Sequence, residues 1–410
     1  MSVLRNRAVA ALLAAEVVSS IGTQMTWLAL PWFVLTTTGS PQRMTYVIVA
    51  EIVPLALFGF LGGAIADRLG NRRTMLVCDF ARAPLMAAIP ALHEAGRLPF
   101  WALVALVAAT GAFIAPYYAV QRAIVPDLIG EDQNRLARLT AVFQAAQRLT
   151  IFLGPPLAGV LIAVIGTAQL LYVDAATYLA SFLLVAAFVR ISPSVEPEHG
   201  PDARGVLAGL RFVAHDRLLR AWIVAFVFID VAWQSLFATM PVLVVRHYHA
   251  DPKVLGWILG ALGAGALVGA AAAYRLVDRF DALALASVAF ACQMTSAWLL
   301  AVPAPWLVPF GALFGAGFFM SIVNSPTHAL MTLRAPRALR PHVMSVFGTL
   351  FGLSAPLALI VLGSALTRAD PRAVLVVVLA VQTAGIVLFV GAALTERASL
   401  RAAAAADSPA

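Results

Sequence analysis

Charged residues are scarce in this sequence. Of its 410 residues, 12% are charged and 61% are hydrophobic, and the mean hydropathy is +0.89. A soluble domain of this composition would have too little polar surface to cover its exterior. The charged residues gather in short clusters, and the apolar stretches between them are roughly twenty residues long, which is enough to cross the hydrocarbon core of a membrane. The composition excludes an ordinary soluble protein and indicates an integral membrane protein.

The sequence has few cysteines and histidines and no nucleotide-binding motif. It therefore gives no support for a disulfide framework, a metal centre or an enzyme. Cys78 and Cys292 both fall within apolar stretches, and neither has a partner nearby in sequence. The seven histidines include no pair four residues apart. Together with the lack of an Asp-rich tetrad, this argues against a membrane-embedded enzyme acting on lipids or isoprenoids. Without a Walker motif the chain does not hydrolyse ATP itself. We expect no enzymatic activity, no cofactor and no metal.

Lysine is nearly absent, with Lys253 as the single example, so the net charge of +8 comes from arginine. The arginines outside the apolar stretches lie in short loops, which is the pattern of membrane-topology signals and not of a nucleic-acid-binding surface. If the N-terminus is cytoplasmic, 19 arginines fall in cytoplasmic segments and six basic residues fall on the other side. We therefore expect a multi-pass protein of the bacterial cytoplasmic (inner) membrane, with both termini in the cytoplasm and no nucleic-acid partner.

Twelve apolar stretches account for most of the chain. Helices are favoured because the stretches are too long for barrel strands and lack the alternation of barrels. The predicted helices lie at about residues 8–35, 44–66, 74–93, 99–125, 138–163, 169–190, 219–245, 253–274, 282–301, 306–332, 342–366 and 372–394. The first stretch is longer than the apolar core of a signal peptide, so we expect it to be retained as the first span.

The longest loop divides these helices six and six, so the expected fold is an all-α membrane protein of two six-helix bundles. The first bundle covers residues 1–190 and the second covers residues 219–394. Between them lies a cytoplasmic linker, residues 191–218, whose second part has the spacing of an amphipathic helix. Residues 395–410 form a cytoplasmic tail. The two halves resemble each other weakly, which indicates either a parallel repeat or chance similarity among apolar helices.

The most specific segment joins the second and third predicted helices. It reads Gly63-Ala64-Ile65-Ala66-Asp67-Arg68-Leu69-Gly70-Asn71-Arg72-Arg73. Its arginines hold the loop in the cytosol, and Gly70 permits a tight turn. The segment resembles the signature loop of the major facilitator superfamily, Gly-x-x-x-Asp-Arg-x-Gly-x-Arg-Arg, and twelve helices in two bundles fit that family across essentially the whole chain.

This resemblance implies that the loop latches the two halves of the protein and gates a conformational change. The residues assigned to the latch are Asp67, Arg68, Gly70, Arg72 and Arg73, together with Asp79 and Arg82 on the next helix. Asp79 and Arg82 lie one turn apart, where they neutralise each other or the loop. A basic loop with a purely topological role is the alternative.

A second motif lies in the fifth predicted helix. Gly154-Pro155-Pro156-Leu157-Ala158-Gly159 resembles the Gly-Pro-x-x-Gly-Gly antiporter motif, which separates exporters from importers in the superfamily, although Ala158 replaces one glycine. A motif of this kind produces a proline-kinked helix with a face of small residues, which allows another helix to approach closely. The motif, carried by Gly154, Pro155 and Gly159, favours export. A kink that serves packing alone is the alternative.

One feature of drug–proton antiporters is missing. The fourth helix has Val107 where those proteins carry arginine, so their proton-coupling scheme does not transfer directly. The chain is similar to the macrolide-efflux and enterobactin-exporter-like branch. The similarity lies in Asp79-x-x-Arg82, in Arg122 with Pro126, and in Tyr172-x-Asp174-Ala175-Ala176. The substrates of that branch are varied, so the resemblance does not name the cargo.

Ionisable groups at membrane depth are costly and are therefore functional candidates by default. The resemblance implies that helices 1, 4, 7 and 10 line a central cavity. The candidates for proton coupling and for the substrate cavity are Glu16, Gln24, Trp27, Arg148, Asp230, Gln234 and Asn324. Aromatic rings with one or two carboxylates suit a bulky amphipathic or cationic substrate. A structural role is the alternative for each carboxylate, and Arg148 would then pair with a carboxylate across the seam between the bundles.

These observations predict a secondary active exporter of a small amphipathic molecule of the drug, antibiotic or siderophore type. We expect proton antiport with alternating access, a monomeric protein, and a small-molecule substrate, protons and membrane lipid as its partners. A lipid flippase, facilitator or sensor that resembles a transporter but lacks proton coupling is the alternative, because the arginine of the fourth helix is absent.

The arginine asymmetry makes a topological prediction. Reporter domains fused to either terminus or inserted in the loop 191–218 should report a cytoplasmic location, because positively charged loops stay on that side of the membrane. A fusion inserted after residue 249 should report the opposite side. A periplasmic reading for the loop 191–218 would contradict the predicted number of spans.

Overall fold

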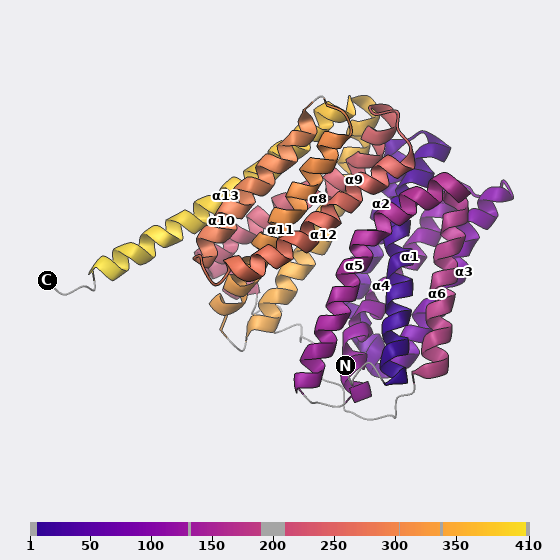
Figure 1. Ribbon diagram of the computed structural model, residues 1–410, viewed down its shortest axis with the longest axis horizontal. Coiled ribbons are helices and arrows are strands. Elements are labelled where there is room, and N and C mark those ends of the chain that lie inside the picture. Colours follow the sequence, from indigo (N-terminus) through magenta and orange to yellow (C-terminus); the bar gives the residue numbers. More distant parts are fainter. Residues whose placement is uncertain (1–5, 130–132, 190–209, 303, 337–338, 407–410) are drawn as a thin grey trace. The chain divides into compact units, whose positions relative to one another are not determined.

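The computed structural model describes residues 6–129, 133–189, 210–302, 304–336 and 339–406 (Figure 1). All regular structure in these ranges is helical, so the predicted all-α fold class is confirmed. The long helices are α1 (Arg7–Thr38), α2 (Pro41–Leu69), α3 (Asn71–Glu94), α4 (Phe100–Ile129), α5 (Gln133–Ile165), α6 (Thr167–Phe188), α8 (Arg217–Arg246), α9 (Pro252–Leu276), α10 (Ala282–Trp298), α11 (Leu307–Arg334), α12 (Arg340–Arg368) and α13 (Pro371–Ala406). A 3-10 turn, η2 (Leu299–Ala301), follows α10.

The long helices coincide with the predicted spans. By length and composition, ten of the described helical segments can cross a membrane. In α12 the apolar stretch Ser354–Arg368 is shorter, and part of the side chains of α2 lie outside the described portion. The largest difference in a boundary is in α13, which continues to Ala406 instead of ending near residue 394. The added turns are rich in alanine and arginine, which are strong helix formers.

Capping residues define where several helices begin and end. Asn6 caps α1 by accepting a hydrogen bond of 3.0 Å from the Ala8 N–H. At the other end Gly39 adopts a φ of 65° and donates its N–H to the Leu35 carbonyl at 2.9 Å. Gly70, with a φ of 79°, separates α2 from α3. Glycine tolerates these left-handed conformations, so the chain reverses direction within one or two residues at both places.

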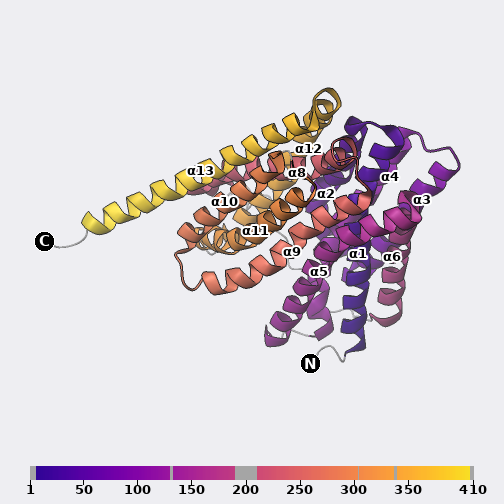
Figure 2. The same ribbon diagram turned by 45° about the horizontal axis from the view of Figure 1, so that its top comes forward.

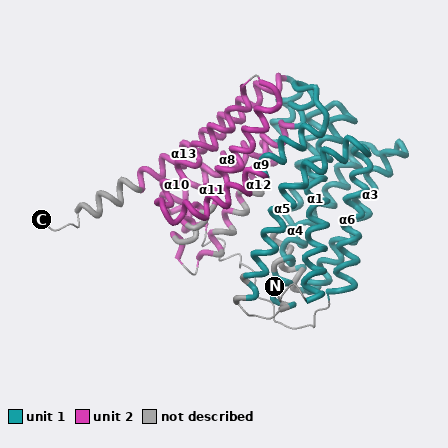
Figure 3. Tube along the Cα trace, viewed as in Figure 1, with its two compact units in different colours: residues 1–200, 241–263, 359–368 teal, residues 201–240, 264–358, 369–410 magenta. Residues whose placement is uncertain are grey.

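The chain forms two compact units, coloured separately in Figure 3. Unit 1 covers residues 1–200, 241–263 and 359–368, and so contains α1 to α6, the end of α8, the first half of α9 and the end of α12. Within it, α6 packs against α1 and α3, α4 packs against α2 and α3, and α1 also contacts α5. Figures 1 and 2 both show α1, α5 and α6 side by side. Apolar side chains such as Leu12 and Ile124 fill its core.

Unit 2 covers residues 201–240, 264–358 and 369–410. Its helix α10 packs against α11 and α13. The core is aromatic: the rings of Trp222 and Phe389 stack with their centroids 4.8 Å apart, and further phenylalanines surround them. Aromatic pairs of this kind add to the stabilisation that their buried area gives.

Glycine lets α9 approach α11 closely within unit 2. A Cβ atom added to Gly265 would overlap the carbonyl oxygen of Phe314, and one added to Gly269 would overlap that of Phe318. No side chain fits at either point, so this helix contact depends on glycine, as close contacts between membrane helices commonly do.

The close contact between α9 and α11 predicts that a methyl group added at Gly265 destabilises the protein. Gly265→Ala should lower the melting temperature of the purified protein in detergent, because overpacking of this kind costs roughly 1–3 kcal/mol. Gly391→Ala is the matched control, since nothing lies within 4 Å of a Cβ added there. Equal melting temperatures for the two variants would contradict the importance of the contact.

Candidate functional site

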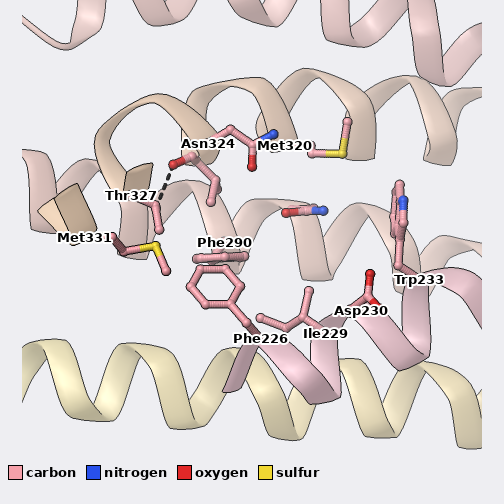
Figure 4. A pocket seen from close by; sticks show the side chains of 11 residues that line it. Phe226, Ile229, Asp230, Trp233, Phe290, Met320, Asn324, Thr327 and Met331 are labelled. Carbon is pink, nitrogen blue, oxygen red and sulfur yellow. Dashed lines mark hydrogen bonds between the residues drawn. The ribbon is translucent and has the colours of Figure 1, made fainter. Parts of the chain in front are cut away.

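A pocket of about 160 Å³ lies within unit 2 between α8, α10 and α11 (Figure 4). Its apolar lining is provided by Phe226, Trp233, Phe290, Met320 and Met331. A cavity of about 150 Å³ is enough to hold a benzene molecule, so this pocket has room for one aromatic ring of a ligand. The methionines can adapt their shape to different ligands, because their side chains are unbranched and flexible.

Polar groups face the same pocket. Asp230 accepts a hydrogen bond of 2.8 Å on its Oδ2 from the Ser354 hydroxyl. Gln293 is 3% exposed, and its Oε1 has no hydrogen-bond partner among the described residues. Thr327 turns its hydroxyl back to the Val323 carbonyl, the dashed contact in Figure 4. Because buried acceptors are normally satisfied, a carboxylate beside an open amide oxygen suits a ligand that donates hydrogen bonds and carries positive charge.

Helical spacing brings the side chains of α8 into this pocket. Phe226, Asp230 and Trp233 are separated by about one turn each and therefore share a face of the helix. Of the predicted cavity residues, Asp230 and Asn324 line the pocket. Gln234 is half-buried on α8 outside the set of residues that line it.

Sequence reasoning missed Gln293 and the aromatic rings near it. Two signals were available. Gln293 is an amide within an otherwise apolar helix, and polar groups at membrane depth are functional candidates. Phe226 precedes Asp230 by one turn, and Phe290 precedes Gln293 by nearly one turn, so both rings fall on the faces that carry the polar groups.

The remaining predicted cavity residues belong to unit 1 and lie in different environments there. On α1, Glu16 is 4% exposed whereas Trp27 is 52% exposed, so the predicted stripe on this helix does not face one environment. Gln24 lies against α5, where a Cβ added to Gly154 would overlap the Cβ of Gln24. Arg148 on α5 is exposed.

Arg72, in the first turn of α3, attaches the signature loop to the end of α6 within unit 1. Arg72 donates a hydrogen bond of 2.9 Å from Nη2 to the Ala186 carbonyl, and its Nε donates to the Val189 carbonyl. A cation at these free carbonyls stabilises the C-terminal end of a helix. Arg68 and Arg73 are exposed. The side chain of Asp67 lies outside the described part of the structure.

Asp79 and Arg82, which the sequence groups with this loop, lie deeper in unit 1. Both are buried on α3, and their partners are on α1 and α6. Asp174, from the Tyr172-x-Asp174-Ala175-Ala176 segment, is buried beside them on α6. Separate motifs of the sequence therefore converge on one polar cluster.

Gly159 of the α5 motif lies against α9 in unit 1, whereas Gly154 lies against α1. A Cβ added to Gly159 would lie 2.7 Å from the Pro252 carbonyl oxygen. One added to Gly256 of α9 would lie 2.6 Å from the Pro155 carbonyl oxygen. The two backbones are thus in direct contact, and larger residues at these positions would separate them.

Arg246, at the end of α8, binds two helix ends in the same unit. It donates from Nη1 to the Leu366 carbonyl of α12 at 2.9 Å and from Nη2 to the Gly39 carbonyl after α1 at 3.4 Å. Close by in α12, a Cβ added to Gly363 would overlap the Thr45 hydroxyl of α2. Carbonyls at helix C-termini lack intrahelical partners, so one guanidinium here holds together helices from the first and second halves of the sequence.

Comparisons with known proteins bear on the whole chain. The family model described as Major Facilitator Superfamily matches residues 12–359. A multidrug efflux pump, Tap, of Mycolicibacterium fortuitum is 29% identical over 368 residues, which cover 86% of this chain and 87% of that protein. Macrolide efflux protein A of Streptococcus pyogenes is 20% identical over 259 residues, covering 62% of this chain and 63% of that protein. Among solved structures, a mutant of the nucleoside transporter NupG has a TM-score of 0.78 at 12% identity, covering 94% of this chain and 99% of its own.

The Arg246 contacts predict a local effect. Arg246→Ala should speed amide hydrogen exchange in the last turns of α1 and α12 several-fold, because a cation at an exposed helix C-terminus contributes roughly 0.3–1 kcal/mol. Arg97→Ala, an exposed arginine beyond the end of α3, serves as the control and should leave both segments unchanged. Unaltered exchange in Arg246→Ala would show that these hydrogen bonds do not hold the helix ends together.

Proposed function

This chain belongs to the major facilitator superfamily, and on that premise we propose that it exports small amphipathic molecules from the bacterial cytoplasm by proton antiport. The pocket in unit 2 is the observation that carries the proposal, because it combines a carboxylate, an open amide oxygen and three aromatic rings. The Tap pump and macrolide efflux protein A are named for drug export, and the antiporter-like motif of α5 favours the same direction of transport.

The chemistry of the pocket favours a substrate with an aromatic ring and a positive charge. A ring fits among Phe226, Trp233 and Phe290, and a cation over such rings is attracted to their faces. Asp230 would pair with the charge, while Gln293 would accept a hydrogen bond from the substrate. Flexible methionine side chains in a binding site are typical of proteins that bind several ligands.

Export requires the protein to expose this pocket to each side of the membrane in turn. The contacts in unit 1 support such a mechanism, because the small residues of α5 and α9 and the guanidinium of Arg246 bring together helix ends from both halves of the sequence. These are hydrogen bonds and van der Waals contacts, which can form and break as helices move. We assign the signature loop, Asp67 to Arg73, the role of a latch that stabilises one of the two states.

Proton antiport also needs a carboxyl group that binds either a proton or the substrate. The sequence nominates Glu16 and Asp230, and Asp230 lies in the pocket where a cationic substrate would bind. A cation that pairs with the Asp230 carboxylate must bind more weakly as the pH falls and a proton occupies that group. The protein would then take up a proton as it releases its substrate to the outside.

Asp230→Asn tests both parts of this proposal. It should weaken binding of a monovalent aromatic cation such as ethidium by about tenfold to a hundredfold, because hydrogen bonds to charged groups contribute roughly 1.5–3 kcal/mol. The pH dependence of binding should flatten, since no group in the pocket then exchanges the proton for the cation. Binding is measured by fluorescence on the purified protein.

Two comparisons make the result specific. Asp370→Asn, an exposed carboxylate before α13, should bind ethidium as the wild type does at every pH. Glu16→Gln should retain binding of ethidium in the unit 2 pocket. Loss of proton-driven transport in this variant would show that the Glu16 carboxyl takes part in coupling, and wild-type transport would show that it does not. Wild-type affinity with a wild-type pH profile in Asp230→Asn would remove Asp230 from the substrate site.

A further inference from the structure

A polar cluster inside unit 1 is not used by the pocket of unit 2. Its central groups are Asp79 and Arg82 on α3, which are 0% and 2% exposed, and Asp174 and Tyr178 on α6, which are also buried. Because α6 packs against both α3 and α1, the cluster is enclosed by neighbouring helices. Charged groups in such a place are expensive and are seldom kept for packing alone.

Arg82 is held by contacts other than its nearest carboxylate. Its Nη2 donates a hydrogen bond of 3.2 Å to the Thr23 hydroxyl of α1. Its guanidinium carbon lies 3.9 Å from the centroid of the Tyr178 ring and 5.5 Å from that of Tyr117. The distance from Nη1 to the Asp79 Oδ1 is 3.9 Å, which is too long for a hydrogen bond. Arg82 and Asp79 therefore form an ion pair without a direct hydrogen bond in this structure.

Asp79 has one oxygen that is bonded and one that is not. Its Oδ2 accepts a hydrogen bond of 2.6 Å from the Ser181 hydroxyl of α6. Its Oδ1 has no hydrogen-bond partner among the described residues, and neither has the Nε of Arg82. The Asp79 carboxylate and the Arg82 guanidinium are buried one turn apart, and each has an atom without a hydrogen-bond partner among the described residues. A small movement would let them form a direct, charge-assisted hydrogen bond.

Asp174 differs from Asp79 because both of its oxygens are occupied. Oδ2 accepts a hydrogen bond of 2.6 Å from the Thr26 hydroxyl. Oδ1 accepts a longer one of 3.1 Å from the Thr177 hydroxyl, which also donates to the Asp174 backbone carbonyl at 2.7 Å. Two hydroxyl donors suit an ionised carboxylate, so Asp174 is fitted to be the permanent counter-ion of Arg82. The Asp79 carboxyl, with its free oxygen, is the one that has room for a proton.

The number of charges in the cluster supports the distinction between a permanently ionised Asp174 and a protonatable Asp79. The ionisable groups that face the cluster from the surrounding helices are Glu16 on α1, Glu51 on α2, Cys78 on α3, Tyr117 and Tyr118 on α4, and Tyr178 on α6. Within the described ranges, Arg82 is the cation in electrostatic range of Glu51, Asp79 and Asp174. One guanidinium cannot neutralise three carboxylates, and an unpaired charge buried in this way costs several kcal/mol. The cluster must therefore hold protons.

We propose that Asp79 is the group in unit 1 that takes up and releases the coupling proton, with Arg82 as its switching partner. This inference rests on the proton-driven export proposed above and adds, in unit 1, a second proton site to the Asp230 carboxyl of the substrate pocket. A proton adds to the Asp79 carboxylate from one side of the membrane and later leaves to the other side, and no other covalent bond changes.

Proton release changes what Arg82 binds. With Asp79 protonated, Arg82 keeps the contacts to Thr23 and Tyr178 that the structure shows. Once the proton leaves, the Asp79 carboxylate attracts Arg82, and the distance of 3.9 Å between Nη1 and Oδ1 shortens to that of a hydrogen bond. Because Thr23 lies on α1 and Tyr178 on α6, this movement weakens the contacts of α3 with both helices, and the proton thereby acts on the packing of unit 1.

The experiment compares two kinds of transport by the purified full chain in liposomes. Exchange of ethidium across the membrane at equal pH needs no net proton movement, whereas accumulation driven by a pH gradient does. Asp79→Asn should exchange ethidium at about the wild-type rate but lose accumulation. This variant keeps the Asp174 carboxylate within electrostatic range of Arg82, so we expect it to fold. Glu94→Gln, an exposed carboxyl at the end of the same helix, should behave as the wild type in both assays.

The outcomes are distinguishable. Accumulation at the wild-type level in Asp79→Asn would overturn the inference while leaving export intact. A wild-type protein that neither exchanges nor accumulates ethidium would overturn the proposed export of aromatic cations, and this inference with it. Should Asp79→Asn fail to fold, Asp79→Glu decides. Its pH for half-maximal accumulation should shift while exchange does not, and an unshifted pH would refute the role of Asp79.

Discussion

A polar group buried between helices in a membrane has no water to bond with, so it must find its partner inside the protein. Most of this structure follows from that constraint. The backbone satisfies it by forming helices almost throughout the described ranges. The buried residues Thr23, Thr150 and Thr327 donate their hydroxyls to carbonyls of their own helices.

The two polar sites meet this constraint in opposite ways. In unit 1 the side chains of the protein enclose the charges: the hydroxyls of Thr26 and Thr177 donate to Asp174, and the ring of Tyr178 covers Arg82. In unit 2 the amide oxygen of Gln293 is left open beside Asp230. An enclosed cluster with an excess of carboxylates suits the binding of a proton, which needs no space, and a pocket with an open acceptor suits a ligand that brings its own hydrogen-bond donors.

The sequence was sufficient for the fold but not for the sites. Each helix is visible as an apolar stretch of the length of a membrane, so all twelve long helices were predictable, and the end of α13 was missed because its last turns are polar and lie beyond the membrane-length pattern. Asp230 and Asn324 were found because a polar group in an apolar helix is conspicuous. The partners of Arg82 were not predictable, since Thr23 and Tyr178 are ordinary residues that only the packing of α1 and α6 brings to it.

The central claim is that export of an aromatic cation is driven by protons that move the other way. The most direct measurement uses purified protein in liposomes with an acidic lumen, with the membrane potential clamped, and follows ethidium, whose charge is permanent, together with the internal pH. Ethidium should accumulate in the lumen against its gradient while the lumen becomes less acidic faster than in liposomes without protein. Two results would contradict the account. One is accumulation of ethidium with no more proton flux than in liposomes without protein, and the other is a proton flux that does not change when ethidium is present.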